Sequence, residues 1–226
     1  MSGHLFEIEI KSLLGSREAA DSLKERMRAL DPSCTLKNSY TQLNHYFESG
    51  DPVKLAETFA PFVTSEVGER MRVMAKGEKI SVRTREMNGV AKIVMKASVG
   101  SDSSANGVAR MELEEPVAGK TLDELDTLVQ SAGYAYQAKW SRTREEYEAG
   151  GVSVCLDKNA GYGYLAEFEK VVDDAAKAEA TKQELLAFMR ELGVAELPQD
   201  RLERMFAFYN AHWPEYYGTE KIFTVE

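Results

Sequence analysis

Residues 80–99, ISVRTREMNGVAKIVMKASV, alternate apolar and polar side chains on either side of an Asn-Gly pair. Such alternation is typical of half-buried strands, because successive side chains leave a strand on opposite faces. Asn88-Gly89 is a strong hairpin signal, since both central positions of the tightest hairpin turns have positive φ. A third alternating segment, VARMELEEPV (108–117), follows a stretch rich in Gly, Ser, Asp and Asn. These residues therefore predict an antiparallel meander of three strands.

Five more segments with strand-like alternation surround this meander. They are HLFEIEIK (4–11), YTQLNHYF (40–47), AYQAKWSRTREEY (135–147), VSVCLDK (152–158) and YLAEFEKVV (164–172). Helices are expected after Ser16 and Asp51-Pro52, at the capping box Thr121–Glu124, before Gly193 and after Pro198. Because most strands are joined by hairpins, we predict an α+β fold, an eight-stranded antiparallel β-barrel or tunnel with flanking helices. A parallel doubly wound sheet is disfavoured.

The composition indicates an ordinary soluble protein with an acidic surface. The 226 residues carry 28 Lys and Arg against 37 Asp and Glu, a formal net charge of −9. That charge argues against partners such as nucleic acid or an anionic membrane, since its field repels polyanions. We expect no transmembrane span and no signal peptide, and hence a cytoplasmic protein. Two cysteines and three histidines without ligand spacing exclude a disulfide framework and a thiolate zinc site.

Charged residues occupy one parity of nearly every predicted strand. They are Glu7, Glu9, Lys11, Arg83, Arg85, Lys92, Lys96, Arg110, Glu112, Glu114, Arg142, Arg144, Asp157, Glu167 and Glu169. Solvated outer faces of half-buried strands also alternate in this way. Here, however, the same charge recurs two residues apart in EIE, RTR, ELE and EFE, and like charges on one face favour a ligand of opposite charge. Carboxylates suit Mg²⁺ or Mn²⁺ and clustered Arg and Lys suit a phosphate chain, so the pattern predicts a site for a metal-bound polyphosphate.

In these motifs and their order the sequence resembles the CYTH superfamily, the triphosphate tunnel metalloenzymes, which include class IV adenylyl cyclases, thiamine triphosphatases and inorganic tripolyphosphatases. EIEIK (7–11) fits the family signature ExExK. The agreement continues through VRTRE, the strand with Lys96, MELE, the K-x-x-R-x-R strand that starts at Lys139, then CLD and AEFE. It covers roughly residues 4–195. ExExK alone is a weak pattern, whereas the ordered set across eight strands is specific.

The resemblance implies an eight-stranded tunnel whose basic residues hold a triphosphate and whose acidic residues hold a divalent metal, Mg²⁺ or Mn²⁺. The implied triphosphate-binding residues are Lys11, Arg83, Arg85, Lys96, Arg142 and Arg144. The implied metal ligands are Glu7, Glu9, Glu167 and Glu169, assisted by Asp157 and by Glu112 or Glu114. Glu7, Glu9, Lys11 and Asp157 are the implied catalytic residues. Lys139 has the opposite parity from Arg142, so it reaches the tunnel only through a bulge.

The chain is expected to form a single CYTH-like domain over residues 1–226, with two additions. A helical insertion is expected at about 51–78, with Leu55, Phe59, Phe62 and Val63 on one helix face. It is interpreted as a lid, a specificity element or an inert outer insertion. A C-terminal helical extension at about 196–226 is interpreted as a cap over the tunnel mouth or a dimer contact. His45, alone on its strand, is interpreted as a packing residue.

The leading functional hypothesis is a metal-dependent hydrolase of a small triphosphate, either inorganic tripolyphosphate, thiamine triphosphate or a nucleoside triphosphate. No covalent nucleophile is recognisable, so a metal-coordinated water oriented by a carboxylate is the expected attacking group. One alternative is a class IV adenylyl cyclase that converts ATP to cyclic AMP and pyrophosphate. Another is a non-catalytic polyphosphate-binding module. For each of these functions the chain is expected to act as a monomer or homodimer.

Overall fold

The computed structural model describes residues 6–98 and 110–225 as eight strands, six α-helices and two short 3₁₀ helices. The strands are β1 (Phe6–Gly15), β2 (Thr35–Glu48), β3 (Glu78–Met87), β4 (Val90–Ser98), β5 (Arg110–Pro116), β6 (Ala135–Ala149), β7 (Val152–Asn159) and β8 (Gly163–Val172). The α-helices are α1 (Arg17–Leu30), α2 (Pro52–Phe59), α3 (Ser65–Met74), α4 (Leu122–Ser131), α5 (Ala178–Glu191) and α6 (Gln199–Tyr216). The 3₁₀ helices are η1 (Ala60–Phe62) and η2 (Ala175–Lys177).

The eight strands form one sheet in the order β1-β8-β7-β6-β2-β3-β4-β5. The pairs β1–β8, β8–β7, β7–β6, β2–β3, β3–β4 and β4–β5 are antiparallel. The predicted class, α+β with an eight-stranded antiparallel sheet and flanking helices, is therefore confirmed. Within the described ranges the order has two ends, β1 and β5, so hydrogen bonds do not close the sheet. Among the described residues, no helix has the length and apolar character needed to span a membrane.

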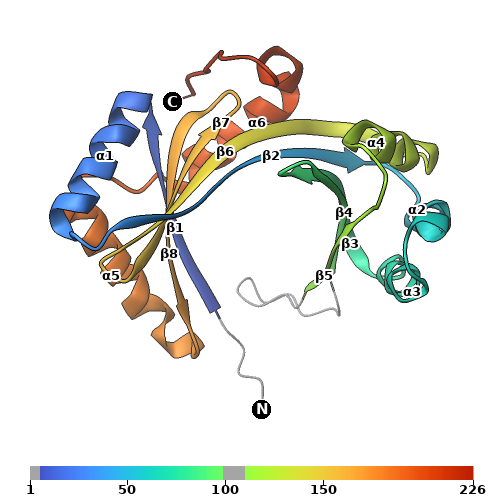
Figure 1. Cartoon of the computed structure of the whole chain (residues 1–226), viewed down its shortest axis with the longest axis horizontal. Helices are drawn as coiled ribbons and strands as arrows, with labels where there is room; N and C mark the ends of the chain where they lie inside the picture. The colour runs from blue at the N-terminus through green and yellow to red at the C-terminus, as the bar shows by residue number, and fades with distance from the viewer. Residues whose placement is uncertain (1–5, 99–109, 226) are drawn as a thin grey trace. The chain divides into compact units, whose positions relative to one another are not determined.

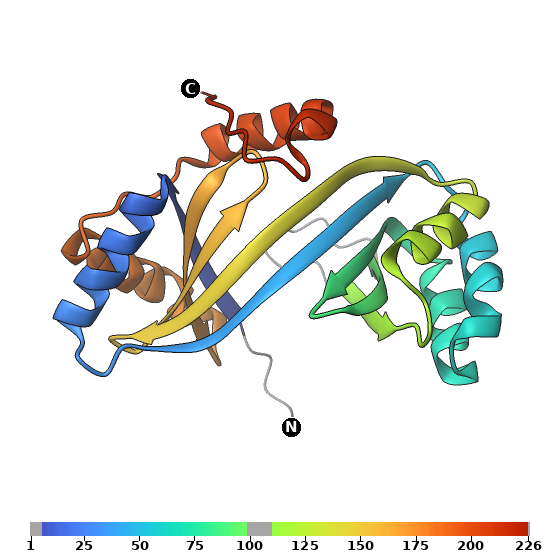
Figure 2. The same ribbon diagram turned by 45° about the horizontal axis from the view of Figure 1, so that its top comes forward.

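The chain forms two compact units, each with its own core. The first unit consists of Met1–Thr41 and Ser141–Glu226, and the second unit consists of Gln42–Trp140. The long strands β2 and β6 run side by side and pass through both units (Figure 2). Strands β1 and β2 are longer than the sequence predicts. Their additional residues, Ser12–Gly15 and Thr35–Ser39, do not alternate apolar and polar side chains and so give no strand signal.

In the first unit, helices α1 and α5 cover one face of β1, β7 and β8 (Figure 1). Ile10 and Phe168 on the strands pack in one apolar cluster with Leu23 of α1 and Leu185 of α5. Ser16 caps α1 as predicted, because its Oγ accepts a hydrogen bond from the backbone N–H of Ala19 at 3.2 Å. The strands of this unit are therefore apolar on the helix side, which leaves their other face for polar residues.

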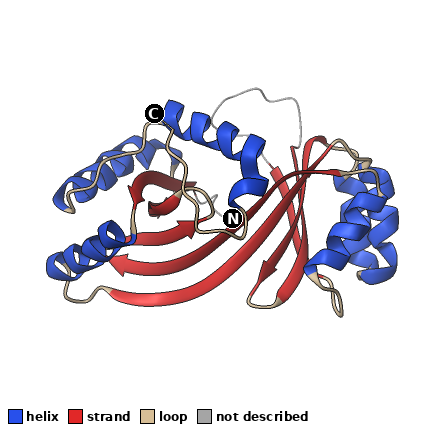
Figure 3. Ribbon diagram, turned by 90° about the horizontal axis from the view of Figure 1, so that it is seen from above, coloured by secondary structure: helices blue, strands red, loops and turns tan. Residues whose placement is uncertain are grey.

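In the second unit, α2, α3 and α4 pack on one face of β3, β4 and β5 (Figure 3). Leu55, Met71 and Leu125 from the three helices share a core with Ile93 and Met95 of β4. The predicted capping box is present at the start of α4, where the side chains of Thr121 and Glu124 bond each other's backbone N–H groups. This core again covers a single face of the strands.

The segment expected as one helix near residue 51 contains two helices instead. Helix α2 ends at Phe59, and α3 begins after Thr64, whose Oγ1 accepts from Val67 N at 3.3 Å. Pro61 lies in the 3₁₀ turn between them, where it interrupts the α-helical spacing. Phe62 is consequently 39% exposed, so its predicted place on the buried face with Leu55 and Phe59 is wrong.

The segment after α6 folds back onto the turn between β7 and β8. Phe223 N donates to the carbonyl of Gly161 at 2.9 Å, and the Phe223 ring lies 4.8 Å from Tyr162 and 6.3 Å from Tyr209. Gly161 has φ +76°, and a Cβ there would lie 2.8 Å from the Phe223 ring. This turn therefore requires glycine for the C-terminal segment to dock.

Candidate functional site: two charged sheet faces

The strands of the first unit present a charged face opposite their helix-covered face. Cross-strand partners point to the same side of a sheet, and the register pairs Glu9 with Glu169, Lys11 with Glu167, and Arg144 with Asp157. We call this surface the first charged face; its residues are Glu9, Lys11, Arg142, Arg144, Asp157, Glu167 and Glu169. Here the structure brings together the residues of the first unit that the sequence analysis selected, apart from Glu7. Glu7 pairs with Val171 through the backbone, and its side chain lies outside the described residues.

Arg144 is the centre of the first charged face. Its Nε lies 2.7 Å from Asp157 Oδ1 and its Nη2 lies 2.6 Å from Asp157 Oδ2, which is the two-point geometry of a strong guanidinium–carboxylate pair. Arg144 Nη2 also donates to Glu167 Oε2. Arg142 Nη1 reaches the same Asp157 at 3.2 Å, and Lys11 Nζ lies 3.2 Å from Glu167 Oε1. Two arginines and a lysine are thus held in place by two carboxylates.

Burial and charge set the protonation states on this face. Burial alone would lower the pKa of Arg144, but its hydrogen bond to Asp157 and the nearby charge of Glu167 raise it above its ordinary value. Burial alone would raise the pKa of Glu167, but Arg144 and Lys11 hold it below its ordinary value. Asp157 is only 1% exposed. Arg144 and Glu167 are therefore both charged at neutral pH, within a set of interlocked ion pairs.

Cys155 lies between these charges, opposite Glu167 in the register of β7 and β8. Burial raises the pKa of its thiol to about 11, despite the nearby positive charge of Arg144. The thiol is therefore protonated at neutral pH and a poor nucleophile. Cys155 is therefore not a candidate covalent nucleophile.

The strands of the second unit carry a second charged face, which also includes neutral residues. Its members are Asn44, Tyr46, Arg83, Arg85, Lys92, Lys96, Glu112 and Glu114. Arg85 donates through Nη1 to Glu114 Oε2 at 2.6 Å and through Nε to Asn44 Oδ1 at 2.8 Å. Lys92 Nζ lies 2.9 Å from Glu114 Oε1. Burial would raise the pKa of Glu114, but Lys92 and Arg85 hold it below its ordinary value.

Arg83 is held less completely than Arg85. Its Nη1 donates to the Tyr46 hydroxyl at 2.8 Å, and its guanidinium carbon lies 5.4 Å from the centre of the Tyr46 ring. Arg83 Nη2 is 4.0 Å from Glu112, whose other oxygen lies 3.0 Å from Lys96 Nζ. The buried Nε of Arg83 has no hydrogen-bond partner within the part of the chain that the structure describes. Arg83 is therefore held by fewer hydrogen bonds than Arg85.

Asn44 and Tyr46 are not among the predicted site residues, because both side chains are uncharged. The only signal for them is the polar parity of Gln42, Asn44 and Tyr46 on the second strand. Lys92, which has the charged parity but is not among the implied triphosphate-binding residues, belongs to the second charged face through Glu114. Lys139, as its parity suggested, lies elsewhere, 3.7 Å from Asp126 of α4.

The predicted metal ligands divide between the two faces. Glu112 and Glu114 belong to the second face, and Glu9, Asp157, Glu167 and Glu169 belong to the first face. Among the described side chains, no group of three or more His, Cys, Asp or Glu residues is already arranged as a metal site. The assignment of metal ligands therefore stays a prediction.

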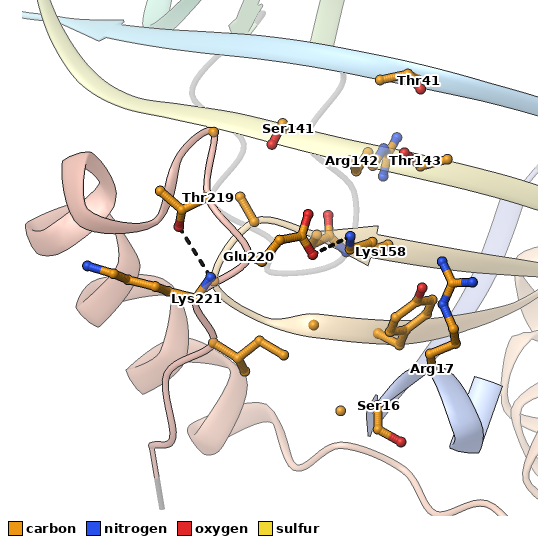
Figure 4. A pocket seen from close by; sticks show the side chains of 18 of the residues that line it. Ser16, Arg17, Thr41, Ser141, Arg142, Thr143, Lys158, Thr219, Glu220 and Lys221 are labelled. Atoms are coloured by element: carbon orange, nitrogen blue, oxygen red, sulfur yellow. Dashed lines mark hydrogen bonds and ion pairs between the residues drawn. The ribbon is translucent and has the colours of Figure 1, made fainter.

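A cavity of about 620 Å³ lies beside the first charged face, within the first unit (Figure 4). The start of α1, the β7–β8 turn and the segment 218–222 line it, together with Arg142 from the charged face. Lys158 and Glu220 form an ion pair across it at 2.6 Å. Gly163, with φ +72°, allows the close approach here, because a Cβ would lie 2.2 Å from the Gly15 carbonyl oxygen. Charged side chains of both signs line the cavity together with apolar groups.

Comparisons with known proteins agree with this architecture. No curated protein sequence matches the chain significantly. A solved protein of Pyrococcus horikoshii superposes with a TM-score of 0.55 at 19% identity, over 90% of this chain and 99% of the other. A conserved hypothetical protein of Pyrococcus furiosus gives 0.54 at 15% identity, over 88% and 99% of the two chains. A Vibrio parahaemolyticus protein proposed to be an adenylate cyclase gives 0.54 at 13% identity, over 89% and 98%.

At these identities the solved structures establish the fold alone, and the sequence family comes from a separate comparison. The model of the CYTH domain family matches residues 70–201, more than half of the chain. The matched range includes Arg83, Arg85, Arg142 and Arg144, whereas EIEIK at 7–11 precedes it. The chain therefore belongs to the CYTH domain family.

Proposed function

We propose that this protein is a divalent-metal-dependent hydrolase of small triphosphates, with inorganic tripolyphosphate, thiamine triphosphate and nucleoside triphosphates as candidate substrates. The observation that carries the proposal is the grouping of cations on one face of each unit, opposite the helix-covered core. The first face supplies Lys11, Arg142 and Arg144, and the second supplies Arg83, Arg85, Lys92 and Lys96. Arg and Lys side chains in such numbers suit the closely spaced negative charges of a phosphate chain.

The arginines are oriented before any ligand binds. Asp157 accepts hydrogen bonds from Nε and Nη2 of Arg144, so Nη1 is the nitrogen that would donate to a phosphate oxygen. On the second face, Asn44 and Glu114 fix the guanidinium of Arg85 in the same manner. Phosphoryl transfer depends mainly on positioning and charge stabilisation, and donors that are already fixed need no reorganisation during the reaction.

The carboxylates of the first face suit a divalent metal. Glu9 and Glu169 are direct cross-strand partners, and like charges in that position repel unless a cation lies with them. Glu9 and Glu169, with Glu7, Glu167 and Asp157, would hold Mg²⁺ or Mn²⁺ through oxygen ligands alone. When bound, such an ion adds positive charge at the transferred phosphoryl group and activates water for attack. Lys11, which contacts both Glu9 and Glu167, links this acidic group to the phosphate-binding cations.

A class IV adenylyl cyclase would use much the same charged residues. The difference lies in the attacking group, which is water in hydrolysis and the ribose 3′-hydroxyl in cyclisation. A polyphosphate-binding module, by contrast, would use carboxylates only to orient its cations, since carboxylates otherwise oppose an anion unless metal neutralises them. The products formed therefore separate these functions better than binding does.

The test is an assay of the purified full chain with Mg²⁺ or Mn²⁺ against tripolyphosphate, thiamine triphosphate and ATP. Released orthophosphate and cyclic AMP are measured separately, with a chelator-treated sample as the blank. We expect metal-dependent orthophosphate release without cyclic AMP, loss of this activity in Arg85→Ala, and full activity in the exposed-lysine control Lys76→Ala. Cyclic AMP with pyrophosphate would establish the cyclase, and binding without any turnover would establish the binding module.

A further inference from the structure

Asp126 of α4 is a buried carboxylate at the centre of a polar network on the helix side of the second unit. It is 2% exposed, as is His45 of β2. Its Oδ1 accepts from Thr84 Oγ1 at 2.5 Å, and its Oδ2 accepts from the Tyr136 hydroxyl at 2.6 Å. His45 Nδ1 lies 2.6 Å and Lys139 Nζ 3.7 Å from the same Oδ2. One carboxylate therefore ties α4 to β2, β3 and β6.

Two members of this network lie directly behind the arginines of the second charged face. His45 is the cross-strand partner of Thr84. Its neighbours in sequence are Asn44 and Tyr46, and those of Thr84 are Arg83 and Arg85. Because side chains alternate along a strand, these neighbours point to the opposite side of the sheet.

The neighbours of His45 are also the residues that hold the arginines. Asn44 is the cross-strand partner of Arg85 and accepts from its Nε at 2.8 Å. Tyr46 is the partner of Arg83 and accepts from its Nη1 at 2.8 Å. Three successive residue pairs of β2 and β3 are thus involved. The middle pair belongs to the Asp126 network on one side of the sheet, and the two flanking pairs form the arginine contacts on the other side.

We propose that Asp126 is a positioning residue for Arg83 and Arg85. By holding His45 and Thr84 together, it fixes the register of β2 against β3 and with it the direction of both guanidinium groups. The connection to triphosphate binding rests on the proposed function, whereas the positioning itself does not.

The energetics of the site favour this role over simple packing. An apolar side chain at position 126 would complete the core without the desolvation of a carboxylate. Apolar side chains alone specify the register less strictly, because a strand shift of two residues keeps every side chain on its own face. A carboxylate that needs both His45 and Thr84 within hydrogen-bond distance does not tolerate that shift.

The direct test is arginine side-chain NMR on the ¹⁵N-labelled full chain, comparing native protein with Asp126→Asn. The Nε–H group of Arg85 donates to Asn44, and that of Arg144 donates to Asp157 in the first unit, which makes it an internal reference. The signals are assigned with Arg85→Lys and Arg144→Lys. We expect solvent exchange of the Arg85 Nε–H to accelerate by roughly tenfold or more in Asp126→Asn, since its acceptor is displaced, with Arg144 unchanged.

Two further variants distinguish a specific effect on Arg85 from a general loss of structure. Asp123→Asn makes the same change on an exposed residue of the same helix, and it should leave both signals as in the native protein. Thr84→Val removes one hydrogen bond while keeping the side-chain shape, and it should accelerate Arg85 exchange by a smaller factor. If Asp126→Asn accelerates exchange of the Arg144 Nε–H as much as that of Arg85, the substitution has disturbed the whole protein, and the milder Thr84→Val becomes the test. Unchanged Arg85 exchange in Thr84→Val, or in a folded Asp126→Asn, would overturn the proposal.

Kinetics then connect the positioning to function. With tripolyphosphate as the probe, Asp126→Asn should raise KM by roughly tenfold through loss of the arginine contacts, with a smaller change in kcat. Asp123→Asn should match the native enzyme. A native protein without turnover would reject the proposed function while the NMR result still decided the role of Asp126. Active protein with altered Arg85 exchange but an unchanged KM would show that Asp126 orders the arginines without serving substrate binding.

Discussion

Arg144 of β6 and Asp157 of β7 form a two-point ion pair, with both oxygens of a carboxylate that is 1% exposed facing Nε and Nη2. Asp157 also bonds Arg142, so one carboxylate holds two arginines of the first charged face. Removing one partner of a buried pair leaves an uncompensated charge, which is among the most destabilising changes a protein can undergo. Loss of either partner should therefore destabilise the fold, and the pair fixes the direction of the phosphate-binding groups.

Asp157→Asn is expected to lower the free energy of unfolding by about 3 kcal/mol, because it leaves Arg144 buried without its full counter-charge. Chemical denaturation of the native and variant proteins measures this difference. The control is Asp173→Asn, which breaks an exposed pair with Lys177 and should change the free energy by less than about 1 kcal/mol. Equal effects of the two substitutions would show that the Asp157 pair has no special role.

Arg85→Lys is expected to raise KM for tripolyphosphate by roughly tenfold, although the charge is kept. The reason is geometric, because the guanidinium bonds Asn44 and Glu114 at once and an ammonium group has no equivalent planar fork. Steady-state kinetics at saturating metal measure the change. Lys96→Arg, a conservative exchange at a single-point contact with Glu112, serves as the matched control and should alter KM much less. A native KM in Arg85→Lys would show that only its charge matters.

The membership of the charged faces could be predicted from sequence because alternation fixes which side of a strand a residue occupies. Arg83 and Arg85, for example, share a side whatever the partners of their strand are. Asn44 and Tyr46 could not be predicted, since their role follows from standing opposite these arginines, and register is a property of two strands.

The role of Asp126, on a helix, could not be predicted from the sequence either. It stands among Leu122, Leu125 and Val129 on the buried side of α4, where a carboxylate contradicts the local pattern. Its partners come from three strands distant in the sequence, so the sequence offers no local signal for them. His45, interpreted as a packing residue, is indeed buried, but as part of this polar network.

Stability in acid should depend on Glu114, whose pKa in the folded protein lies below its ordinary value of 4.5 because Lys92 and Arg85 outweigh its burial. A lowered folded-state pKa gives stabilisation that is complete above the unfolded-state pKa and is lost as the pH falls through the folded-state value. Glu114→Gln should therefore flatten the fall of the unfolding free energy below about pH 4.5. Denaturation series between pH 6 and pH 3 measure the slope. Glu57→Gln, on an exposed position of α2, should leave the native slope, and identical slopes for all three proteins would contradict the prediction.

The C-terminal segment should stabilise the first unit through Phe223. Its ring contacts Tyr162, Phe208 and Tyr216 with centroid distances of 4.8, 5.1 and 5.4 Å. Phe223→Ala is expected to lower the unfolding free energy by about 3 to 5 kcal/mol, as for other buried phenylalanines. Ile222→Ala, next to it and 57% exposed, should cost less than about 1 kcal/mol. A thermal or chemical denaturation series separates the two, and similar values would mean that Phe223 does not anchor the segment.

Metal binding can be tested without turnover, by titrating Mn²⁺ into the protein and measuring free Mn²⁺ by electron paramagnetic resonance. Glu9 and Glu169 stand opposite each other on β1 and β8, so neutralising either removes both a ligand oxygen and part of the repulsion that favours a cation. Glu9→Gln and Glu169→Gln are each expected to weaken Mn²⁺ binding by roughly tenfold or more. Glu191→Gln, an exposed carboxylate at the end of α5, should bind Mn²⁺ as the native protein does. If both Glu9→Gln and Glu169→Gln bind Mn²⁺ as tightly as the native protein does, this pair is not the metal site, and the first charged face would bind phosphate alone.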